Sequence, residues 1–314
     1  MPLLKTIRTL ECGVETTIGT AASSLDGTFH AYDVMVQAEI ENITRESSNT
    51  FGYLQSSQGG YKATVSFKTD LQLTATTAPS WLAILLQGCG YVASGSVFTP
   101  RSEGLSASSG VKSVTLKSYQ DGVIKSAVGC AGNFKITAPA GKLVTIEWEF
   151  QGVWVPPVDG AVPTPTYSVE RPVRYADSAA IWNSNEHCVE SVEFDAGNEI
   201  IMRECPDTVQ GFKSGLIVNR TPMIKINPEA QLVADDDRYG DWLLGTEAAF
   251  TTSFKSVLVD LSAVEMTLAA PKAQIVNIQE GDRNKLITDE IDLQCNRNGA
   301  AVDEDVSISF GAQA

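Results

Sequence analysis

Apolar and polar residues alternate one by one along several stretches of this chain. In residues 63–75, side chains such as Val65 and Phe67 fall on one face of an extended strand, and the polar residues fall on the other. The same period of two recurs in residues 143–150 and 287–295. Because successive side chains of a strand point to opposite faces, the pattern predicts antiparallel sheets with one buried and one solvated face.

Helix is expected in only two places, and both helices are short. Residues 78–88 combine Pro79, which suits the first helical position, with an apolar stripe and a closing glycine. Residues 235–245 repeat this arrangement, with Asp236 or Asp237 as the capping residue. The residues expected to form the apolar stripe and the stop are Trp81, Leu82, Leu85 and Gly88 in the first helix and Trp242, Leu243 and Gly245 in the second.

Turn and loop signals separate the alternating stretches. Asp121-Gly122 is the strongest short hairpin signal, because both positions of the turn tolerate a positive φ. Residues 196–198, with the sequence Ala-Gly-Asn, predict a second hairpin of the same kind. Two stretches rich in Ser, Gly and Asn, residues 44–60 and 93–110, are expected to be loops.

The order of strand, helix, hairpin and strand pair occurs twice along the chain. The fold class expected is therefore mainly β, with two tandem, similar antiparallel domains of the β-sandwich or half-barrel type, each with one short helix. Residues 1–154 would form the first domain with an N-terminal arm, residues 155–167 a Pro-rich linker, and residues 168–314 the second domain. Such a doubled unit is typical of a symmetric building block, because doubling halves the number of copies that a ring needs.

Composition and charge narrow the class of protein. The 314 residues suffice for two domains, and 43% hydrophobic with 19% charged residues indicate a globular chain. The longest apolar run, residues 81–86, is far shorter than the roughly 20 residues of a membrane-spanning helix. The N-terminus has no apolar region of a secretion signal, so assembly in the cytosol is expected. A net charge of −15 would on average repel phosphates, which argues against a nucleic-acid binder.

Neither the cysteines nor the glycines point to a cofactor or metal site. The six cysteines are widely spaced, so free and mostly buried thiols are expected in place of disulfides or a zinc site. Residues 88–93 match the dinucleotide pattern GxGxxA, but they end a helix where that pattern should open one. These glycines are therefore interpreted as a helix stop.

Possible catalytic groups also have simpler explanations. His187 and Cys188 are adjacent on a strand and should point to opposite faces, which prevents a nucleophile and base from meeting. The acidic run at 235–237 is better explained by helix capping than by a cation site. Glu147 and Glu149 lie on the solvated face of a strand, whereas paired catalytic carboxylates need one partly desolvated group.

Three segments carry a distinctive pattern of turns and glycines. Residues 113–153 contain a Y-x-D-G hairpin, a glycine-rich turn ending in Asn, and a strand ending in F-x-G; residues 10–22 contain E-x-x-I-G-T. Residues 219–242 form a third segment, and together the three resemble the tail tube proteins of long-tailed bacteriophages that carry two tube domains. The matching positions in the first two segments are Glu15, Ile18, Gly19, Thr20, Tyr119, Asp121, Gly122, Gly129, Gly132, Asn133, Gly141, Phe150 and Gly152.

The resemblance implies a structural protein without enzymatic activity, cofactor or metal. In this family an inner sheet joins those of its neighbours into a ring, and the rings stack into a hollow tail that delivers DNA to the host. A chain with two fused domains would build that ring as a homotrimer. The implied partners are further copies of the chain and the tape measure, tail terminator and distal tail proteins. DNA would pass without tight binding, and the protein would be assembled in the host bacterial cytoplasm and end in the virion tail.

Contacts between subunits or rings are expected in the two Ser- and Gly-rich segments. Apolar residues within an otherwise polar loop indicate a patch that awaits a partner, and a local tuck into the parent domain is the alternative. The residues expected to make these contacts are Arg45, Phe51, Tyr53, Leu54, Gln58, Phe98 and Arg101.

Two other functions stay open on the sequence. A tube of a bacterial secretion or contractile injection particle would share the fold. An adhesin or carbohydrate-binding module would also be all-β, but it would expose aromatic side chains on one sheet face. Here Trp148 and Phe150 fall on the aliphatic face of their strand, which disfavours that function.

Overall fold

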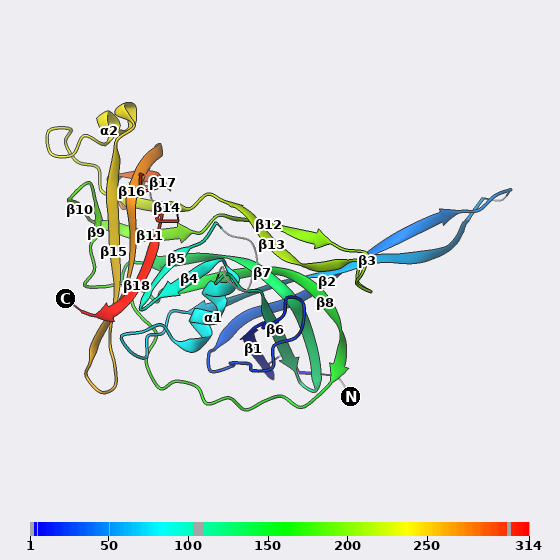
Figure 1. Cartoon of the computed structure of the whole chain (residues 1–314). Coiled ribbons are helices and arrows are strands. Elements are labelled where there is room, and N and C mark those ends of the chain that lie inside the picture. The colour runs from blue at the N-terminus through cyan, green and yellow to red at the C-terminus, as the bar shows by residue number, and fades with distance from the viewer. Residues whose placement is uncertain (1–2, 5, 50, 103–109, 300–302, 314) are drawn as a thin grey trace.

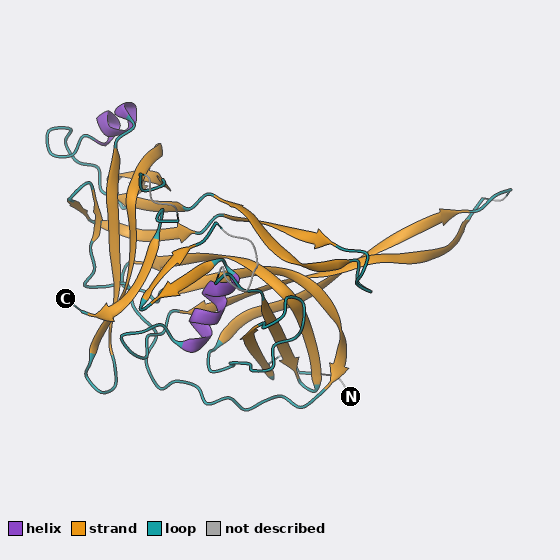
Figure 2. Cartoon of the chain, viewed as in Figure 1, coloured by secondary structure: helices purple, strands orange, loops and turns teal. Residues whose placement is uncertain are grey.

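The computed structural model describes residues 3–4, 6–49, 51–102, 110–299 and 303–313, in which strands dominate and helices are short (Figure 2). The first half of the chain contains β1 (Arg8–Val14), β2 (Ala31–Glu46), β3 (Tyr53–Asp70), α1 (Ser80–Gly88), β4 (Tyr91–Ser94), β5 (Val97–Pro100), β6 (Val114–Gln120), β7 (Val123–Pro139) and β8 (Thr145–Asp159). The second half contains β9 (Ala180–Trp182), β10 (Asn185–His187), β11 (Val189–Asp195), β12 (Asn198–Glu204), β13 (Phe212–Arg220), β14 (Met223–Pro228), α2 (Arg238–Leu244), β15 (Glu247–Val257), β16 (Ala263–Arg283), β17 (Leu286–Cys295) and β18 (Ser307–Ala312). The mainly β fold class predicted from the alternating sequence is confirmed.

The same order of five strands occurs twice in the sheet. Strands β6, β7, β8, β3 and β2 lie side by side in a first set, and β15, β16, β17, β14 and β11 lie side by side in a second. The neighbouring strand is β1 at the β6 edge of the first set and β9 at the β15 edge of the second. Helix α1 follows β3 and helix α2 follows β14, so the helices also occupy matching places in the chain.

The two sets form one continuous sheet. The N-terminal part of β7 pairs with β6, whereas residues 135–139 of β7 pair with β11 of the second set. At the C-terminus β18 pairs with β16 and also with β5 of the first half (Figure 1). The division into two domains with a boundary near residues 154 and 168 therefore stays a prediction, although the repeated strand order is compatible with it.

A single hydrophobic core runs under the sheet. Val65 and Phe67 of β3 and Trp148 of β8 are at most 2% exposed, which is the dry face that their alternation predicts. The ring of Trp148 lies 5.5 Å from that of Phe134 in β7, and Phe134 lies 5.7 Å from Phe194 in β11. The core therefore continues across the junction between the two sets.

Helix α1 packs as its apolar stripe predicts. Trp81, Leu82 and Leu85 are at most 3% exposed, and the helix contacts β1, β6 and β7. Pro79 immediately precedes the first helical residue, Ser80, so the predicted start is displaced by a single position. Fixing φ near −65° there favours the entry of the chain into the helix.

Helix α2 has the predicted ends but not the predicted burial. Asp237 caps it by accepting a hydrogen bond from the Gly240 backbone amide, and Gly245 ends it in the left-handed conformation. However, Trp242 is 39% exposed and Leu243 is 88% exposed, so the expectation that they face the core is wrong. The reason is position, because α2 stands beyond the ends of β15 and β16 (Figure 1).

Of the two predicted tight turns, one is confirmed and one is wrong. Asp121 and Gly122 join β6 to β7 with φ values of 43° and 99°. Residues 196–198 do not close a hairpin, because β11 pairs with β14 while β12 pairs with β13. They bend one long hairpin instead, and the Asp195 carboxylate accepts a hydrogen bond from the Gly197 amide at the bend.

Of the two segments predicted as loops, the first is largely strand and the second contains a short hairpin. Residues 44–60 belong mostly to β2 and β3, which pair with each other as far as Glu46 and Tyr53. Cross-strand pairing thus overrides the polar composition of the segment. Within residues 93–110, strands β4 and β5 form a hairpin, and residues 103–109 lie outside the described residues.

The Pro-rich segment 155–167 begins inside a strand. Residues 155–159 are the end of β8, and the ten residues that follow, 160–169, have no regular secondary structure. This stretch runs from the end of β8 to β9, and an isolated bridge between Gln72 and Pro172 fixes it near its C-terminal end. The segment therefore connects the two sets of strands over the surface (Figure 1).

Candidate assembly surfaces

The solvated face of the continuous sheet carries a row of ion pairs between neighbouring strands. Two of them, Lys68–Glu147 and Lys225–Asp292, are equivalent, because the first joins β3 to β8 and the second joins β14 to β17. Exposed pairs of this kind each contribute at most about 1 kcal/mol to stability, so their main effect is on the charge of the face. The pairs are Lys62–Glu39 (3.2 Å), Lys68–Glu147 (2.5 Å), Lys135–Glu193 (2.8 Å) and Lys225–Asp292 (3.3 Å).

Acidic residues outnumber basic residues on this face, which we call the polar face. Asp33, Glu149, Asp195 and Glu290 line its hollows, of about 400, 310 and 410 Å³. Within the part of the chain that the structure describes, none of these four forms an ion pair, and Asp195 accepts a hydrogen bond from Asn133. Together with the four pairs above, these residues comprise eight carboxylates and four lysines, a net charge of −4 for this set.

The two sets meet in an antiparallel ladder between β7 and β11. The Ala196 amide donates a hydrogen bond to the Phe134 carbonyl at 3.1 Å at one end of the ladder. Hydrogen-bonded and non-hydrogen-bonded pairs alternate in such a ladder. Glu193 and Thr137, which lie opposite each other three residues from that hydrogen bond, are therefore a non-hydrogen-bonded pair with closely spaced side chains.

Beyond the bend at residues 196–198, hairpin β12–β13 leaves the sheet edge and crosses β7 and β8. Gly215 of β13 lies so close to β8 that a Cβ atom there would be 2.6 Å from the Gln151 carbonyl oxygen. The turn of the hairpin reaches β3, where the Tyr61 amide donates to the Gln210 carbonyl at 3.1 Å. The second set thus contacts the first both along an edge and through this docked hairpin.

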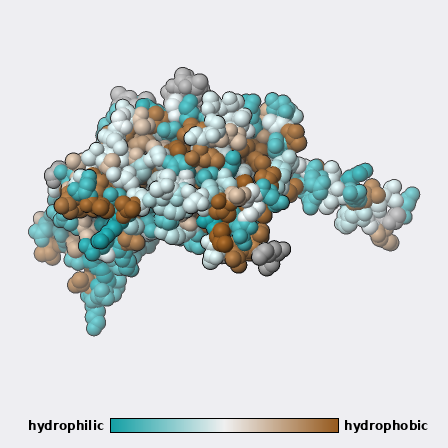
Figure 3. Space-filling view, turned by 90° about the horizontal axis from the view of Figure 1, so that it is seen from below, coloured by the Kyte–Doolittle hydropathy of each residue, from teal (hydrophilic) through white to brown (hydrophobic). Residues whose placement is uncertain are grey.

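The matching hairpin of the first set projects from the body of the protein. Its distal part, residues 41–58, extends away from all other elements and is called the arm (Figure 1). Phe51, Tyr53 and Leu54 near its end are 111%, 77% and 47% exposed. Figure 3 shows hydrophobic atoms at the end of this otherwise polar projection. The arm therefore presents apolar surface that no other element of the described residues covers.

The residues predicted to make contacts divide between the arm and the body. Arg45 lies opposite Leu54 on the arm, and Gln58 is also exposed there. Phe98 is only 3% exposed, and its ring packs 5.8 Å from that of Phe310 in the body of the protein. Arg101 lies apart from the arm, at the pocket described next. The contact roles of these residues stay predictions.

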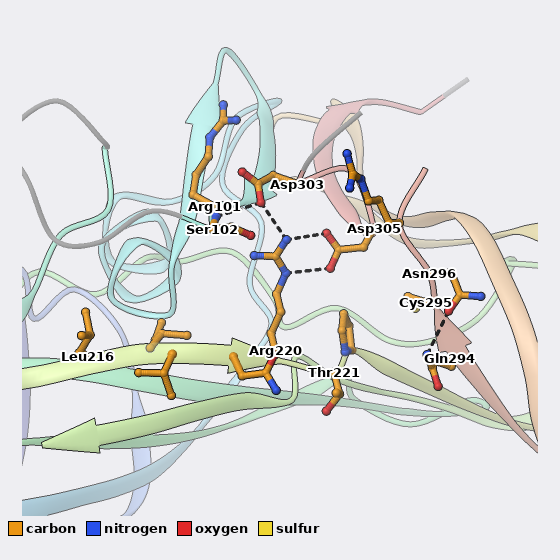
Figure 4. Close-up of a pocket in the computed structure, with 15 residues that line it drawn as sticks. Arg101, Ser102, Leu216, Arg220, Thr221, Gln294, Cys295, Asn296, Asp303 and Asp305 are labelled. Atoms are coloured by element: carbon orange, nitrogen blue, oxygen red, sulfur yellow. Dashed lines mark hydrogen bonds and ion pairs between the residues drawn. The ribbon is translucent and has the colours of Figure 1, made fainter. Parts of the chain in front are cut away.

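A pocket of about 550 Å³ opens beside the C-terminal end of β13 (Figure 4). Arg220 reaches across it, donating from Nε to Asp305 at 2.8 Å and from Nη2 to Asp303 at 3.0 Å. The Ser102 amide donates to the same Asp303 oxygen at 2.9 Å. Other residues lining the pocket are Leu216, Ile217 and Val218 of β13 and Gln294, Cys295 and Asn296 near the end of β17.

Hydrogen bonds keep this cluster charged. Burial opposes the charge of Arg220, but its hydrogen bonds with Asp305 and Asp303 outweigh burial and raise the pKa of the guanidinium. Burial alone would raise the pKa of Asp303, yet hydrogen bonds from Ser102 and Arg220 hold that pKa below its usual value. The cluster fastens the base of the docked hairpin to the segment that follows β5 and to the one that precedes β18.

A family model described as phage tail tube protein matches residues 9–314, which is nearly the whole chain. The chain belongs to the phage tail tube protein family. A comparison with curated proteins gave no significant match. Family membership gives the protein a structural role in a phage tail tube, a place in the virion tail, and assembly with itself and other tail proteins. The resemblance drawn from the sequence is confirmed.

The N-terminal motif of this tail tube protein contains a buried carboxylate. Glu15 is 3% exposed and accepts four hydrogen bonds. Two come from the backbone amides of Gly19 and Gly129, and two come from the hydroxyl groups of Ser113 and Thr115, at 2.6–2.8 Å. Such a satisfied carboxylate is expensive to remove, because its donors would be left buried without partners. Glu15 therefore joins the segment after β1 to β6 and β7.

Other reactive groups of the tail tube protein have structural surroundings. His187 is buried and Cys188 is exposed, so they point to opposite faces as predicted. Burial and the neighbouring Arg238 lower the pKa of His187, which keeps its ring neutral. All six cysteines are free, and among the described residues no group of three or more His, Cys, Asp or Glu side chains could hold a metal. Neither helix in the described residues is long and apolar enough to cross a membrane.

The sequence alone missed several of these residues. It identified Glu15 as part of a motif but not its four donors. Arg220 lies in the third matching segment, but nothing in the sequence linked it to Asp303 and Asp305, because these residues are far apart in the sequence and meet only when β13 is docked. The spacing of the two aspartates, two residues apart, is the one feature that could have suggested a shared partner.

Proposed function

We propose that three copies of this protein close into a ring with pseudo-sixfold symmetry, and that the rings stack into the hollow tube of a phage tail. The observation that carries the proposal is the junction between β7 and β11, by which one chain already joins two equivalent sets of strands into one sheet. Repeating that junction between chains would leave no open edge, which is how closed sheets avoid uncontrolled pairing. Three chains would supply six sets of strands.

In this proposal the polar face lines the bore, and DNA passes along it into the host. A lining with eight carboxylates and four lysines repels the phosphate backbone on average, so that DNA slides without being held. The net charge of −15 of the whole chain acts in the same direction. Each of the four lysines in these ion pairs is already bound to a carboxylate on a neighbouring strand, so it offers no free contact to phosphate.

Light scattering and negative-stain microscopy of the concentrated protein test the ring. Rings with a central hole and the mass of three 33.6 kDa chains, or tubes made from them, are the expected result. A protein that stays monomeric at high concentration, or that forms solid fibres, would contradict the proposal. A filter-binding assay tests the lining separately: no retention of duplex DNA is expected at micromolar protein and physiological salt, and retention would contradict a repelling bore.

A further inference from the structure

We propose that the β2–β3 hairpin of one copy binds the next copy in the way that β11–β14 and its docked extension bind the first set within the chain. Strand β2 would pair with residues 275–283 of β16, and the arm would cover the pocket beside Arg220. The inference rests on the proposed function, because it names the two surfaces through which copies in a ring would join.

No described strand pairs with either of the two edges needed for this pairing, and on β2 the Arg8 guanidinium donates a hydrogen bond to the Val34 carbonyl. Residues 263–274 of β16 pair with β15, but no described strand pairs with residues 275–283 on that side. The equivalent edge of β7 is the one that β11 occupies. Strand β2 pairs with β3 along one edge only, whereas its counterpart β11 pairs on both edges. Each chain thus has one donor edge and one acceptor edge of matching kind.

Two equivalent lysines of the polar face show which residue of β2 corresponds to Glu193 of β11. Lys68 of β3 lies opposite Tyr32 of β2, and Lys225 of β14 lies opposite Glu193 of β11. Both lysines also pair with a carboxylate on the following strand, β8 or β17, as described above. Tyr32 is therefore the counterpart of Glu193.

Two buried isoleucines, one in β7 and one in β16, show which residue of β16 corresponds to Thr137 of β7. Ile136 of β7 and Ile278 of β16 are counterparts, because each is buried opposite an isoleucine of the next strand. The residues that follow them are Thr137 and Gln279. Since Glu193 faces Thr137 within the chain, Tyr32 of one copy should face Gln279 of the next. Tyr32 is 46% exposed, and Gln279 is exposed as well.

The same correspondence places the arm over the pocket. The docked hairpin crosses β8 at Gln151 and ends at Tyr61 of β3. Trp148 and Leu293 are equivalent, and Gln151 and Asn296 each follow them by three residues, so Asn296 is the counterpart of Gln151. Lys68 and Lys225 are equivalent, and Tyr61 and Val218 each precede them by seven residues, so Val218 is the counterpart of Tyr61. Both Asn296 and Val218 line the pocket, so the path of the arm leads across it.

The two surfaces also agree in chemical character. The end of the arm carries Phe51, Tyr53 and Leu54, all exposed. The pocket floor includes Leu216 and Ile217, and the nearby Val218 is 47% exposed. Apolar groups exposed on both surfaces would be removed from water by this contact, which is the usual role of such patches. A second copy of the chain is thus the occupant that the geometry specifies.

Disulfide trapping tests the strand register. In a background with Cys188 and Cys205 replaced by Ser, Tyr32→Cys and Gln279→Cys are combined, and the assembled protein is oxidised mildly. Their counterparts form a non-hydrogen-bonded pair, in which Cβ atoms are close enough for a disulfide. Linked dimers and trimers on a non-reducing gel are the expected result.

Two matched variants control the trapping experiment. Glu193→Cys with Thr137→Cys should give a disulfide within one chain, because these residues face each other in the structure. Tyr32→Cys with Asn277→Cys is two residues out of register on the same face and should give at least several-fold less linked product. If rings or tubes form and only the internal pair becomes linked, the inference is overturned while the proposed function stands. If no rings form under any condition, the proposed function fails and this inference fails with it.

Photo-crosslinking tests the position of the arm. A benzophenone amino acid replaces Tyr53, and peptides linked after illumination of the tubes are identified by mass spectrometry. Links to residues 216–221 or 294–297 of another copy are expected. Links confined to the same chain, or to α2 of another copy, would overturn the placement. The same probe at Val169, which is 80% exposed but distant from the arm in the sequence, should give no link to the pocket.

Discussion

Hairpins β12–β13 and β2–β3 extend equivalent strands of the sheet, yet one is docked and the other projects into solvent. A Cβ at Gly215 in the docked hairpin would meet the backbone of β8, whereas the atoms nearest to a Cβ at Gly59 on the other hairpin belong to the Glu41 side chain. The docked hairpin finds its binding surface because another set of strands precedes it in the same chain. The arm has no such set within reach in the described part of its own chain, and in our proposal a second copy supplies one.

The strands at the base of the two hairpins differ in the same way. Glu193 of β11 is half-buried, while its counterpart Tyr32 of β2 is 46% exposed. β11 pairs with a strand on each of its edges, whereas β2 pairs with β3 along one edge only. The other edge of β2 therefore has no partner strand in the described residues, as at the edge of any open sheet.

Replacing the end of the arm should have the largest effect of any change considered. A Gly/Ser linker in place of residues 51–58 removes Phe51, Tyr53 and Leu54, which contact no other element of their own chain. We expect an unchanged circular dichroism spectrum and melting temperature, with complete loss of tubes in negative-stain images. The matched control is the same linker in place of residues 206–210 at the turn of the docked hairpin, which should lower the melting temperature. Tubes of normal length from the arm variant would show that assembly depends on other surfaces.

The two helices repeat the contrast on a smaller scale, because α1 is packed and α2 is exposed. Leu85→Ala in α1 should reduce the free energy of unfolding by about 2–5 kcal/mol, since Leu85 is fully buried and its removal leaves a cavity. Leu243→Ala in α2 should change it by less than about 0.5 kcal/mol, because Leu243 is 88% exposed. Chemical denaturation of both variants measures the difference. Equal losses would mean that α2 is packed in the isolated protein.

The sequence predicted what depends on neighbouring residues. Alternation gave the buried faces of β3 and β8, and Asp121-Gly122 gave a turn, because period and positive φ are local properties. It failed where long-range pairing decides. Residues 44–60 look like a loop by composition but become strands through pairing, and residues 196–198 look like a hairpin but bend one.

The candidate site shows the same division. Exposed apolar residues on the arm, such as Phe51, could be recognised from their polar surroundings in the sequence. The edge at residues 275–283, which we propose as the acceptor, could not be recognised in the sequence. It arises because β16 continues beyond Gln274, the last of its residues that pairs with β15. The cluster at Arg220 likewise depends on the docking of β13. Burial of Leu243 was predicted wrongly because amphipathic spacing cannot reveal whether a helix has a surface to cover.

Matched valine substitutions in the two hairpins sharpen the comparison. Gly215→Val places side-chain atoms against the Gln151 carbonyl and Ala131, so it should reduce the free energy of unfolding by about 1–3 kcal/mol. Gly59→Val on the free hairpin meets only a side chain that can move, so the isolated protein should lose less than about 0.5 kcal/mol. Denaturant titration of both variants gives the two values. A large loss for Gly59→Val would show that the arm is already packed in the free chain.

The smallest expected effect concerns the cluster of Arg220, Asp303 and Asp305, which fastens the docked hairpin. The size of this effect should depend on pH. The pKa of Asp303 is held below its usual value by hydrogen bonds from Ser102 and Arg220, so ionised Asp303 stabilises the folded protein above its unfolded pKa of about 3.9. Asp303→Asn should therefore reduce the free energy of unfolding by about 1–2 kcal/mol at pH 7.

The same linkage fixes how this difference changes with acid. A depressed carboxylate pKa gives stability that is lost as the pH falls through the folded-state pKa, so the difference between the wild type and Asp303→Asn should begin to shrink below about pH 4 and disappear only below the folded-state pKa. Asp177→Asn is the control, because Asp177 is 92% exposed and its contact with Lys255 is 3.7 Å long; no measurable difference is expected. Urea titrations between pH 3 and pH 7 supply the comparison. A difference for Asp303→Asn that stays constant over this range would mean that the ion pair with Arg220 contributes nothing to holding the hairpin, and that apolar packing alone keeps β13 in place.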